Sequence, residues 1–482
     1  MVRLPSRPLC SALIALCFLV CRAGSTFAQT ETPPSPGEPI PGTGGVSPFS
    51  GSVPDKPVAG VLSLSLKDAI DRGLRQNLGA LLSNADIRSA RGQRWQQLSA
   101  LLPHATVSPF VDVSQISLTE FGFNFQLPGV TLPSSVGPFS YFDTRLNFNQ
   151  TLFDWKSINS AKAAGQSVKS AEYTYKDARD LVVLAVGYTY LQGIADAARI
   201  KTAEAQVDVA QALYDQAADQ VKAGTSAQID ALRANVELKT RQQQLIQAKN
   251  SYAIQKLTIA RVIGLAPAQD FELTDKSPYQ PFEGMTLEQA LQRAYVSRSD
   301  YQAAVADARA AEYGRKAAAA GYLPSLSFGA NYGVAGGHPS NATQVFDVRG
   351  SLTIPIFLGG SVHGDVLQAE ARLTQAHDRQ ENLRAQIDAD VRTAFLNLQS
   401  SAEQVEVARS NIDLADQTLA QSRDRFSAGV TDSVEVVQSQ ELVASANEQY
   451  ISSLYNFNFA KIALARALGM GEEGVKTFFK EK

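Results

Sequence analysis

Two short stretches decide the fold: QVKAGTSAQIDALRANV (220–236) and, some two hundred residues later, RFSAGVTDSVEVVQSQ (425–440). Each places Ala-Gly and then an acidic residue between long stretches without proline. No proline occurs from Phe139 to Ala266, or from Ile356 to the C-terminus. Because proline inside a helix costs about 3 kcal/mol, each stretch predicts a turn between two long helices.

The turn occurs twice because the whole chain is a duplication. Residues 66–103 align with 287–324 at a constant offset of 221, and from about Val186 onward the offset is 205. The second offset pairs Gly224 with Gly429 and Asp230 with Glu435. The predicted organisation begins with a signal peptide (1–28) and a Pro/Gly-rich periplasmic linker (29–61). A first repeat (62–284) has one initial helix, a β-hairpin (about 105–152) and long helices (about 154–223 and 227–265). A second repeat (285–470) has one initial helix, a β-hairpin (about 325–356) and long helices (about 360–428 and 432–469), and a C-terminal tail (471–482) follows.

The long helices carry a coiled-coil seam. Apolar and small residues recur at alternating steps of four and three, which is the spacing of a supercoiled helix interface. The first copy has Ala203, Val207, Ala210, Tyr214, Ala217, Val221 and Gly224, and the second has Ala408, Ile412, Ala415, Leu419, Ser422, Phe426 and Gly429. Eight of these fourteen positions are Ala, Ser or Gly, so the helices are expected to approach closely in a laterally packed wall.

Residues 1–28 combine Arg3 and Arg7, an apolar run and Thr-Phe-Ala, which is typical of a cleaved secretory signal. The three cysteines all lie in this segment, so the mature chain has no disulfide or thiolate metal site. A lipidated Cys21 is the competing interpretation, although Phe18-Leu19-Val20 lacks the small residues of a lipoprotein cleavage site. Removing the signal leaves 41 basic and 47 acidic residues, and this net charge of −6 gives no indication of nucleic-acid binding.

Between the helices of each repeat the period changes to two. Phe142, Leu146 and Phe148 alternate with polar residues, and in the second copy Phe346, Val348 and Leu352 do the same. A half-buried soluble sheet is one interpretation. The other is a set of membrane-spanning strands, which must close into a barrel because lipid offers no hydrogen bonds to a sheet edge. Four strands are too few, since barrels begin at about eight, so this interpretation requires an oligomer.

With these features, the sequence resembles the TolC-like outer membrane efflux proteins from Leu62 to Met470. The resemblance is carried by the duplication and by the motifs YLPSLSF (322–328), LTIPIFLGG (352–360), AGVTDSVEVVQSQ (428–440), IARVIGL (259–265) and LARALGM (464–470). It implies a mainly α protein with membrane β-structure. It also implies a homotrimer with a twelve-stranded barrel in the outer membrane lipid, on a periplasmic α-helical barrel.

The same resemblance implies the function of a passive exit channel for a tripartite efflux or type I secretion system. The partners are then a periplasmic adaptor and an inner-membrane transporter of the RND, ABC or MFS type, and no catalysis, cofactor or metal is expected. Two other protein classes remain as alternatives: a periplasmic adaptor, and a coiled-coil structural protein without its own channel. The sequence does not identify the exported molecule.

The resemblance places functional residues at the two helical turns. Gly224, Thr225, Gly429, Val430 and Thr431 are candidate adaptor-docking residues. Asp230 and Glu435 match acidic positions of the periplasmic aperture, and Gln438 stands where a second ring acid is expected. Thr431 lies where the family often has an arginine that locks the closed state, so a differently connected gate is predicted.

A purely local role explains the same residues. Acids in the first turn of a helix stabilise its dipole, Asp432 and Glu435 have the spacing of a capping box, and the turn glycines suit left-handed helix caps. The four histidines lack a metal-ligand spacing and are expected at the surface or barrel rim.

Overall fold

The computed structural model describes residues 47–57, 60–120, 122, 133–275, 279, 285–431 and 433–478. The predicted signal peptide, Cys21, most of the linker and the Asp432 capping box lie outside these residues. The chain divides into two units, Met1–Ser47 and Pro48–Lys482, and the second holds every element named below.

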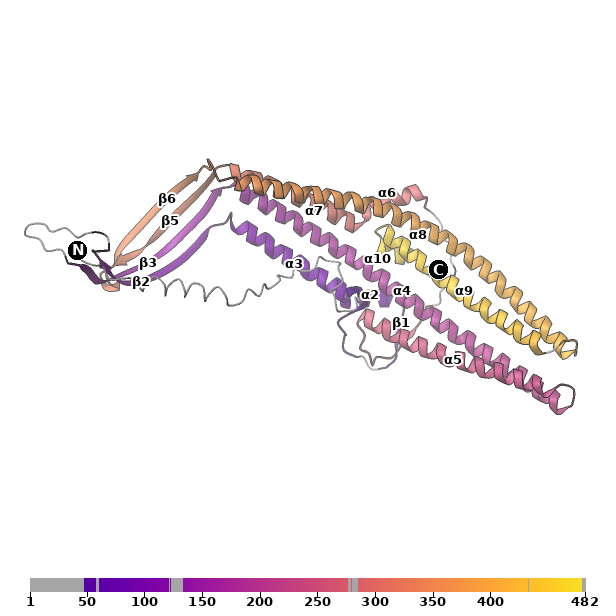
Figure 1. Cartoon of the computed structure of the whole chain (residues 1–482). Helices are drawn as coiled ribbons and strands as arrows, with labels where there is room; N and C mark the ends of the chain where they lie inside the picture. Colours follow the sequence, from indigo (N-terminus) through magenta and orange to yellow (C-terminus); the bar gives the residue numbers. More distant parts are fainter. Residues whose placement is uncertain are drawn as a thin grey trace, which may run out of the picture. The chain divides into compact units, whose positions relative to one another are not determined.

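Four long helices dominate the second unit (Figure 1). They are α4 (Trp155–Lys222), α5 (Gln228–Ile263), α8 (Ser361–Ser427) and α9 (Ser433–Ala467). At 1.5 Å per residue, the 68 residues of α4 rise about 102 Å. Asp154 caps this helix, because its side chain accepts hydrogen bonds from the backbone N–H groups of Lys156 and Ser157.

Each repeat begins with two helices where the sequence suggested one. The pairs are α2 (Leu66–Gln76) with α3 (Leu78–Ser99), and α6 (Leu287–Ser297) with α7 (Ser299–Ala319). The breaks fall at Asn77 and Arg298, which have extended ψ angles of 133° and 119°. Asn77 is fully buried and its amide donates to the carbonyls of Phe49 and Val262, so tertiary hydrogen bonds fix this break.

A four-stranded antiparallel sheet lies at one end of the long helices (Figure 1). Its order is β2 (His104–Ser117), β3 (Ser135–Phe153), β5 (Ser325–Gly336) and β6 (Thr343–Thr353). One hairpin comes from each repeat, and β3 joins β5 across the duplication. The sheet therefore has β2 and β6 as its two edges.

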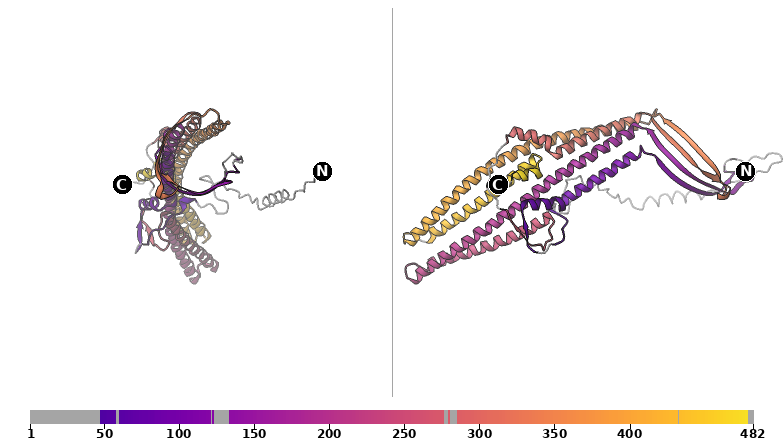
Figure 2. Two further views of the ribbon diagram at one scale, coloured as in Figure 1. Left: turned by 90° about the vertical axis from the view of Figure 1, so that its left-hand side faces the viewer. Right: turned by 180° about the vertical axis from the view of Figure 1, so that it is seen from behind.

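The helices pack side by side as a curved wall (Figure 2). One core cluster includes Val182, Val186 and Ile259 of the first repeat, and a second includes Ile387, Val391 and Leu464 of the second repeat. The predicted seam is largely buried, with Ala210 and Ala217 of α4 at most 1% exposed. One window of α4 is apolar enough for a membrane span, but 56% of it is buried in the protein. The duplicated long-helix and hairpin fold is thus confirmed.

The duplication extends to the helix ends. Gly264 and Gly469 follow α5 and α9 with φ of 74° and 69°. A Cβ at Gly264 would lie 2.4 Å from Cβ of Gln76, and one at Gly469 would lie 2.7 Å from the backbone N of Arg298. Both glycines thus allow a left-handed cap to press against the junction between the first two helices of the same repeat.

Shorter elements complete the unit. They are η1 (Pro48–Ser50), β1 (Leu62–Leu64), β4 (Phe271–Leu273), η2 (Ala320–Tyr322), η3 (Pro339–Asn341) and α10 (Gly471–Phe478), with β1 and β4 paired in parallel. The segment predicted as a C-terminal tail therefore forms a short helix over most of its length. Arg179 of α4 forms an ion pair of 2.7 Å with Glu472 of α10, which ties this helix to the wall.

Candidate functional site

The two helical turns have the same backbone structure. Gly224 and Gly429 adopt φ of 73° and 71°, and neither is crowded. The N–H of Thr225 donates to the carbonyl of Gln220, and that of Val430 donates to Arg425, both at 2.9 Å. These are the hydrogen bonds of a left-handed helix cap, so the predicted turn glycines are where the local structure requires them. Both turns lie at the end of the long helices away from the sheet, which we call the tip (Figure 1).

Asp230 joins the two turns. The long helices form two helical hairpins, α4–α5 and α8–α9. The Asp230 carboxylate, in the first, accepts a hydrogen bond of 2.8 Å from the hydroxyl of Ser433 in the second, and one of 2.9 Å from Ser226 in its own turn. Arg233 lies 3.7 Å from the same carboxylate. Ser433 is fully buried and the Asp230 side chain is 16% exposed, so this contact is partly shielded from water. The first predicted aperture acid is therefore a link between hairpins as well as a helix-start residue.

Glu435 has partners only in its own hairpin among the described residues. Its carboxylate accepts hydrogen bonds from Thr431 and Ser422, and the Arg425 guanidinium lies 3.3 Å away. Gln438, one turn later, is exposed. Thr431 thus contacts the acid directly, while the positive charge comes from Arg425, before the turn. Sequence reasoning did not single out Arg425, although it opens the quoted stretch; its pairing depends on how the turn folds back.

Further ion pairs connect the hairpins above the tip. Arg241 of α5 is 3% exposed and pairs with Glu237 at 2.6 Å and with Glu441 of α9 at 2.8 Å. Arg199 of α4 pairs with Glu448 of α9 at 2.7 Å. Burial would raise the pKa of the Glu448 carboxyl, but the Arg199 guanidinium outweighs it and holds that pKa below its ordinary value.

An apolar cluster lies beneath these polar links. It is formed by Leu213, Ala217, Ala234, Leu419, Phe426 and Val436, and so draws on all four long helices. The two helical hairpins are therefore held together by a small core and a few polar contacts. An interface of this kind can switch between two discrete packing arrangements.

At the opposite end, the sheet separates apolar from polar side chains. Val107, Leu146, Tyr332 and Phe346 are register partners across all four strands and are 48–77% exposed. The next row, on the other face, is Thr106, Asn147, Asn331 and Asp347. A continuous exposed apolar face backed by a polar face is the pattern of a membrane barrel segment.

No group of three or more His, Asp or Glu side chains in the described ranges is arranged to hold a metal ion. What the tip and the sheet offer instead is an acidic, polar end of a helical wall and an amphipathic sheet.

Comparison with known proteins agrees with this geometry. The sequence model of the family described as "Outer membrane efflux protein" matches residues 75–265 and 290–470, once in each repeat. The chain is 24% identical to the pyoverdine export outer membrane protein OpmQ of Pseudomonas putida, with 96% of this chain and 97% of that protein covered. It is 24% identical to TolC of Escherichia coli (67% and 68% covered) and 23% identical to the alkaline protease secretion protein AprF of Pseudomonas aeruginosa (69% and 70%).

Solved structures share the fold. The outer membrane protein VceC of Vibrio cholerae superposes with a TM-score of 0.73 at 19% identity, covering 85% of this chain and 97% of VceC. The CmeC outer membrane channel of Campylobacter jejuni gives 0.74 at 17% identity, covering 86% and 88%. Because the family model spans most of both repeats, the chain belongs to the outer membrane efflux protein family.

Proposed function

We propose that this protein is the homotrimeric exit channel of a tripartite efflux or type I secretion system. Its family membership makes it an outer membrane channel protein with a periplasmic portion. The two alternatives, a periplasmic adaptor and a coiled-coil structural protein without its own channel, are therefore wrong. Members of this family are channels rather than enzymes, and this protein would move its cargo passively. The observation that carries the proposal is the four-stranded amphipathic sheet with two free edges.

The sheet supports an oligomer. β2 has 14 residues and β6 has 11, and neither has a partner on its outer side among the described residues. In lipid such edges would leave backbone groups without hydrogen bonds, which costs several kcal/mol for each group. Three copies with β2 of each chain beside β6 of the next would give twelve strands and no edge.

The helical wall supports the same assembly. Its outer edges toward the tip are α5 and α8 (Figure 1). Both carry apolar side chains that face solvent in the single chain: Ile229, Leu232, Val236 and Ile246 on α5, and Leu396, Val407 and Leu414 on α8, all 50–69% exposed. Contact between α5 of one chain and α8 of the next would bury both stripes. A head-to-tail contact closes into a ring when the rotation between neighbouring copies completes a full turn, which three copies would do in the proposed trimer.

The tip is proposed as the periplasmic aperture. Asp230 and Glu435 would supply its acidic groups. Gln438 would add no charge at the position where the family resemblance places a second ring acid. The two turns are proposed to dock a periplasmic adaptor, through which an RND, ABC or MFS transporter would deliver cargo. They comprise the exposed residues Gly224, Thr225, Gly429 and Val430 and the half-buried Thr431. The names of two relatives refer to pyoverdine export and alkaline protease secretion, so both small molecules and proteins are candidate cargo classes.

The test is the mass of the unheated protein extracted in detergent from outer membranes. A mass about three times that of the mature chain, with conducting channels in planar bilayers, is the expected result. A monomer, or recovery from the soluble periplasm alone, would reject the shared barrel.

A further inference from the structure

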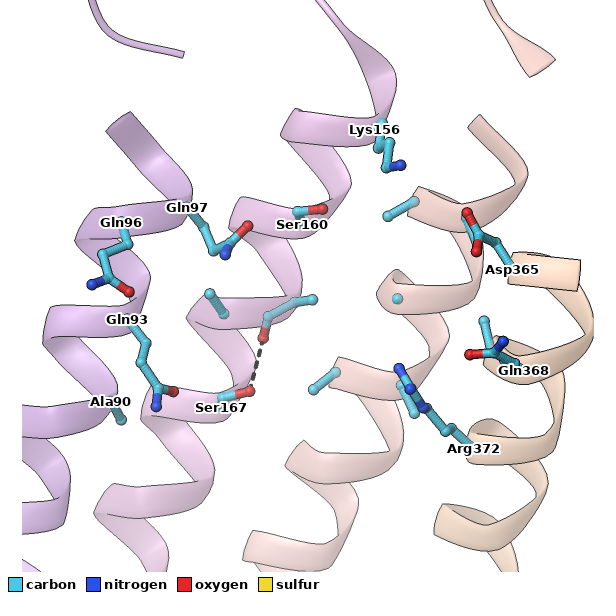
Figure 3. A pocket seen from close by; sticks show the side chains of 18 residues that line it. Ala90, Gln93, Gln96, Gln97, Lys156, Ser160, Ser167, Asp365, Gln368 and Arg372 are labelled. Atoms are coloured by element: carbon cyan, nitrogen blue, oxygen red, sulfur yellow. Dashed lines mark hydrogen bonds between the residues drawn. The ribbon is translucent and has the colours of Figure 1, made fainter. Parts of the chain in front are cut away.

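A hollow of about 580 Å³ lies just below the sheet. It is lined by four helices that run side by side, α3, α4, α7 and α8, and it lies on the concave face of the curved wall (Figures 2 and 3). Its volume is within the range of small-molecule sites, about 300–1,000 Å³. If the chain forms the proposed channel, the concave face is the lumen, and three such hollows would surround it.

The floor of the hollow is kept low by small residues. Along α7 it is formed by Ala310, Ala311, Gly314, Ala317 and Ala318. Gly314 has an ordinary helical φ, and a Cβ added there would meet nothing within 4 Å. Neither the backbone nor packing therefore demands glycine, although glycine costs about 1 kcal/mol relative to alanine inside a helix. Its consequence is open space along the α7 side of the hollow.

Two positively charged side chains lie at the rim of the hollow, one on each side of α7. Lys156 comes from the first turn of α4, and Arg372 comes from α8 (Figure 3). Neither has an ion-pair partner in the part of the chain that the structure describes. Other arginines of the same wall are paired: Arg91 lies 2.9 Å from Glu172, and Arg392 lies 2.7 Å from Asp388.

Polar, uncharged groups complete the rim. The amides of Gln93, Gln97 and Gln368 and the hydroxyl of Ser160 lie around the same hollow (Figure 3). Asp365 on α8 is the single acid among the lining residues. The lining therefore has two positive charges, one negative charge and several hydrogen-bond donors above an apolar floor.

We propose that this hollow is a luminal binding site for the carboxylate or phosphate group of small organic anions passing through the channel. The inference rests on the proposed channel function. Guanidinium and ammonium groups are the usual partners of these oxyanions, and amide and hydroxyl donors complete their hydrogen bonding. The alanine floor accommodates the apolar body of the ligand.

Asp365 tunes the strength of this site. A channel must bind its cargo weakly enough to release it. The acid offsets one of the two positive charges, and both cations are exposed, so the anion is held briefly on its way to the barrel. Removing Asp365 tightens binding.

The experiment uses the full-length protein in planar bilayers, with tripolyphosphate as the probe. The salt concentration is about 0.1 M, at which interactions between exposed charges more than about 10 Å apart are largely screened. The measurement is the probe concentration that halves the single-channel current. The double variant Lys156→Gln/Arg372→Gln is expected to raise it at least about tenfold, because charge-assisted contacts are lost. Gly314→Leu, which fills the hollow without changing its charge, is expected to raise it too, and Asp365→Asn to lower it.

The matched control is Lys162→Gln/Lys169→Gln, which removes two positive charges from exposed positions of α4 that are not among the lining residues. It is expected to leave the block within about twofold of the wild-type value, since exposed charges that make no direct contact with the anion are screened by salt. Equal weakening in both double variants, or an unchanged block with Gly314→Leu, would show a general field effect and overturn the site. Failure of the wild type to form channels would instead reject the proposed function.

Discussion

The hydroxyl of Ser433 donates a hydrogen bond of 2.8 Å to the carboxylate of Asp230, which lies 203 residues earlier in the chain. The two residues begin corresponding helices of the two repeats, so this contact connects the turns that the duplication produced.

Loss of this link is expected to open the tip. A hydrogen bond to a charged group contributes about 1.5–3 kcal/mol, so Ser433→Ala and Asp230→Ala should each shift the population toward separated hairpins. Single-channel conductance in planar bilayers should rise for both variants. Asp219→Ala is the control, because Asp219 is exposed and pairs with Lys222 in its own helix. Unchanged conductance in Ser433→Ala would show that the link does not hold the aperture.

Glu435 is expected to set the ion preference of the aperture. Replacing it by glutamine removes an acid whose contacts are Thr431, Ser422 and Arg425. The reversal potential in a salt gradient should then show a weaker preference for cations, whereas Arg425→Gln should strengthen that preference by leaving the acid uncompensated. Asp424→Asn, beside Arg425 on α8, is the charge-matched control for Glu435→Gln. Equal shifts in these two variants would argue against an aperture role.

Arg241 is expected to stabilise the paired hairpins. In Arg241→Ala the carboxylate of Glu237, whose side chain is 9% exposed, loses its buried partner. Breaking a buried ion pair from one side costs about 3–5 kcal/mol, so the unfolding temperature followed by circular dichroism should fall. Lys222→Ala breaks an exposed pair and should cost less than about 1 kcal/mol. Similar losses in both variants would mean that Arg241 is not a buried anchor.

Asp180 makes stability depend on pH. Burial raises the pKa of its carboxyl to about 6, and neighbouring Asp177 adds to this while Arg466 opposes it. The folded protein therefore binds this proton more tightly than the unfolded chain does. Stability from this group should increase as the pH falls through 6 and level off near the ordinary pKa of 3.8.

The measurement is the unfolding temperature between pH 7.5 and 4.5, compared between the wild type and Asp180→Asn. The variant should unfold at a higher temperature at pH 7.5 and should have a flatter profile, because the buried charge is gone. Asp86→Asn, at an exposed position of α3, should keep the wild-type profile. A steeper profile in Asp180→Asn would contradict the assignment.

Two glycines with the same backbone conformation should differ in their tolerance of alanine. Gly469 and Gly429 have φ of 69° and 71°, but only Gly469 faces backbone atoms, at 2.7 Å from a built Cβ. Gly429→Ala should cost about 1–2 kcal/mol from the left-handed conformation alone. Gly469→Ala should lower the unfolding temperature further, because α9 must also move away from Arg298. Equal decreases in unfolding temperature for the two variants would show that the backbone at Arg298 moves to accommodate the added Cβ without loss of stability.

Local sequence patterns predicted most of the elements, because helices and strands depend on backbone preferences and on the spacing of apolar residues along the chain. Helix α4 runs from Trp155 to Lys222, where a proline-free seam predicted 154–223. The alternation predicted the strands but not their lengths, and β3 has 19 residues. The break at Asn77 was not visible, because its side chain is satisfied by the carbonyls of Phe49 and Val262, and no local pattern records those partners.

The sequence by itself determined the duplication, the long helices, the amphipathic strands and the two glycine turns, since each follows from spacing along one stretch of chain. Only the tertiary structure decided which polar groups meet. Thr431 and Arg425 share Glu435 because the turn folds back, and Ser433 meets Asp230 because the hairpins lie together. The hollow beneath Lys156 and Arg372 likewise arises from four helices, distant in sequence, whose small residues face the same side.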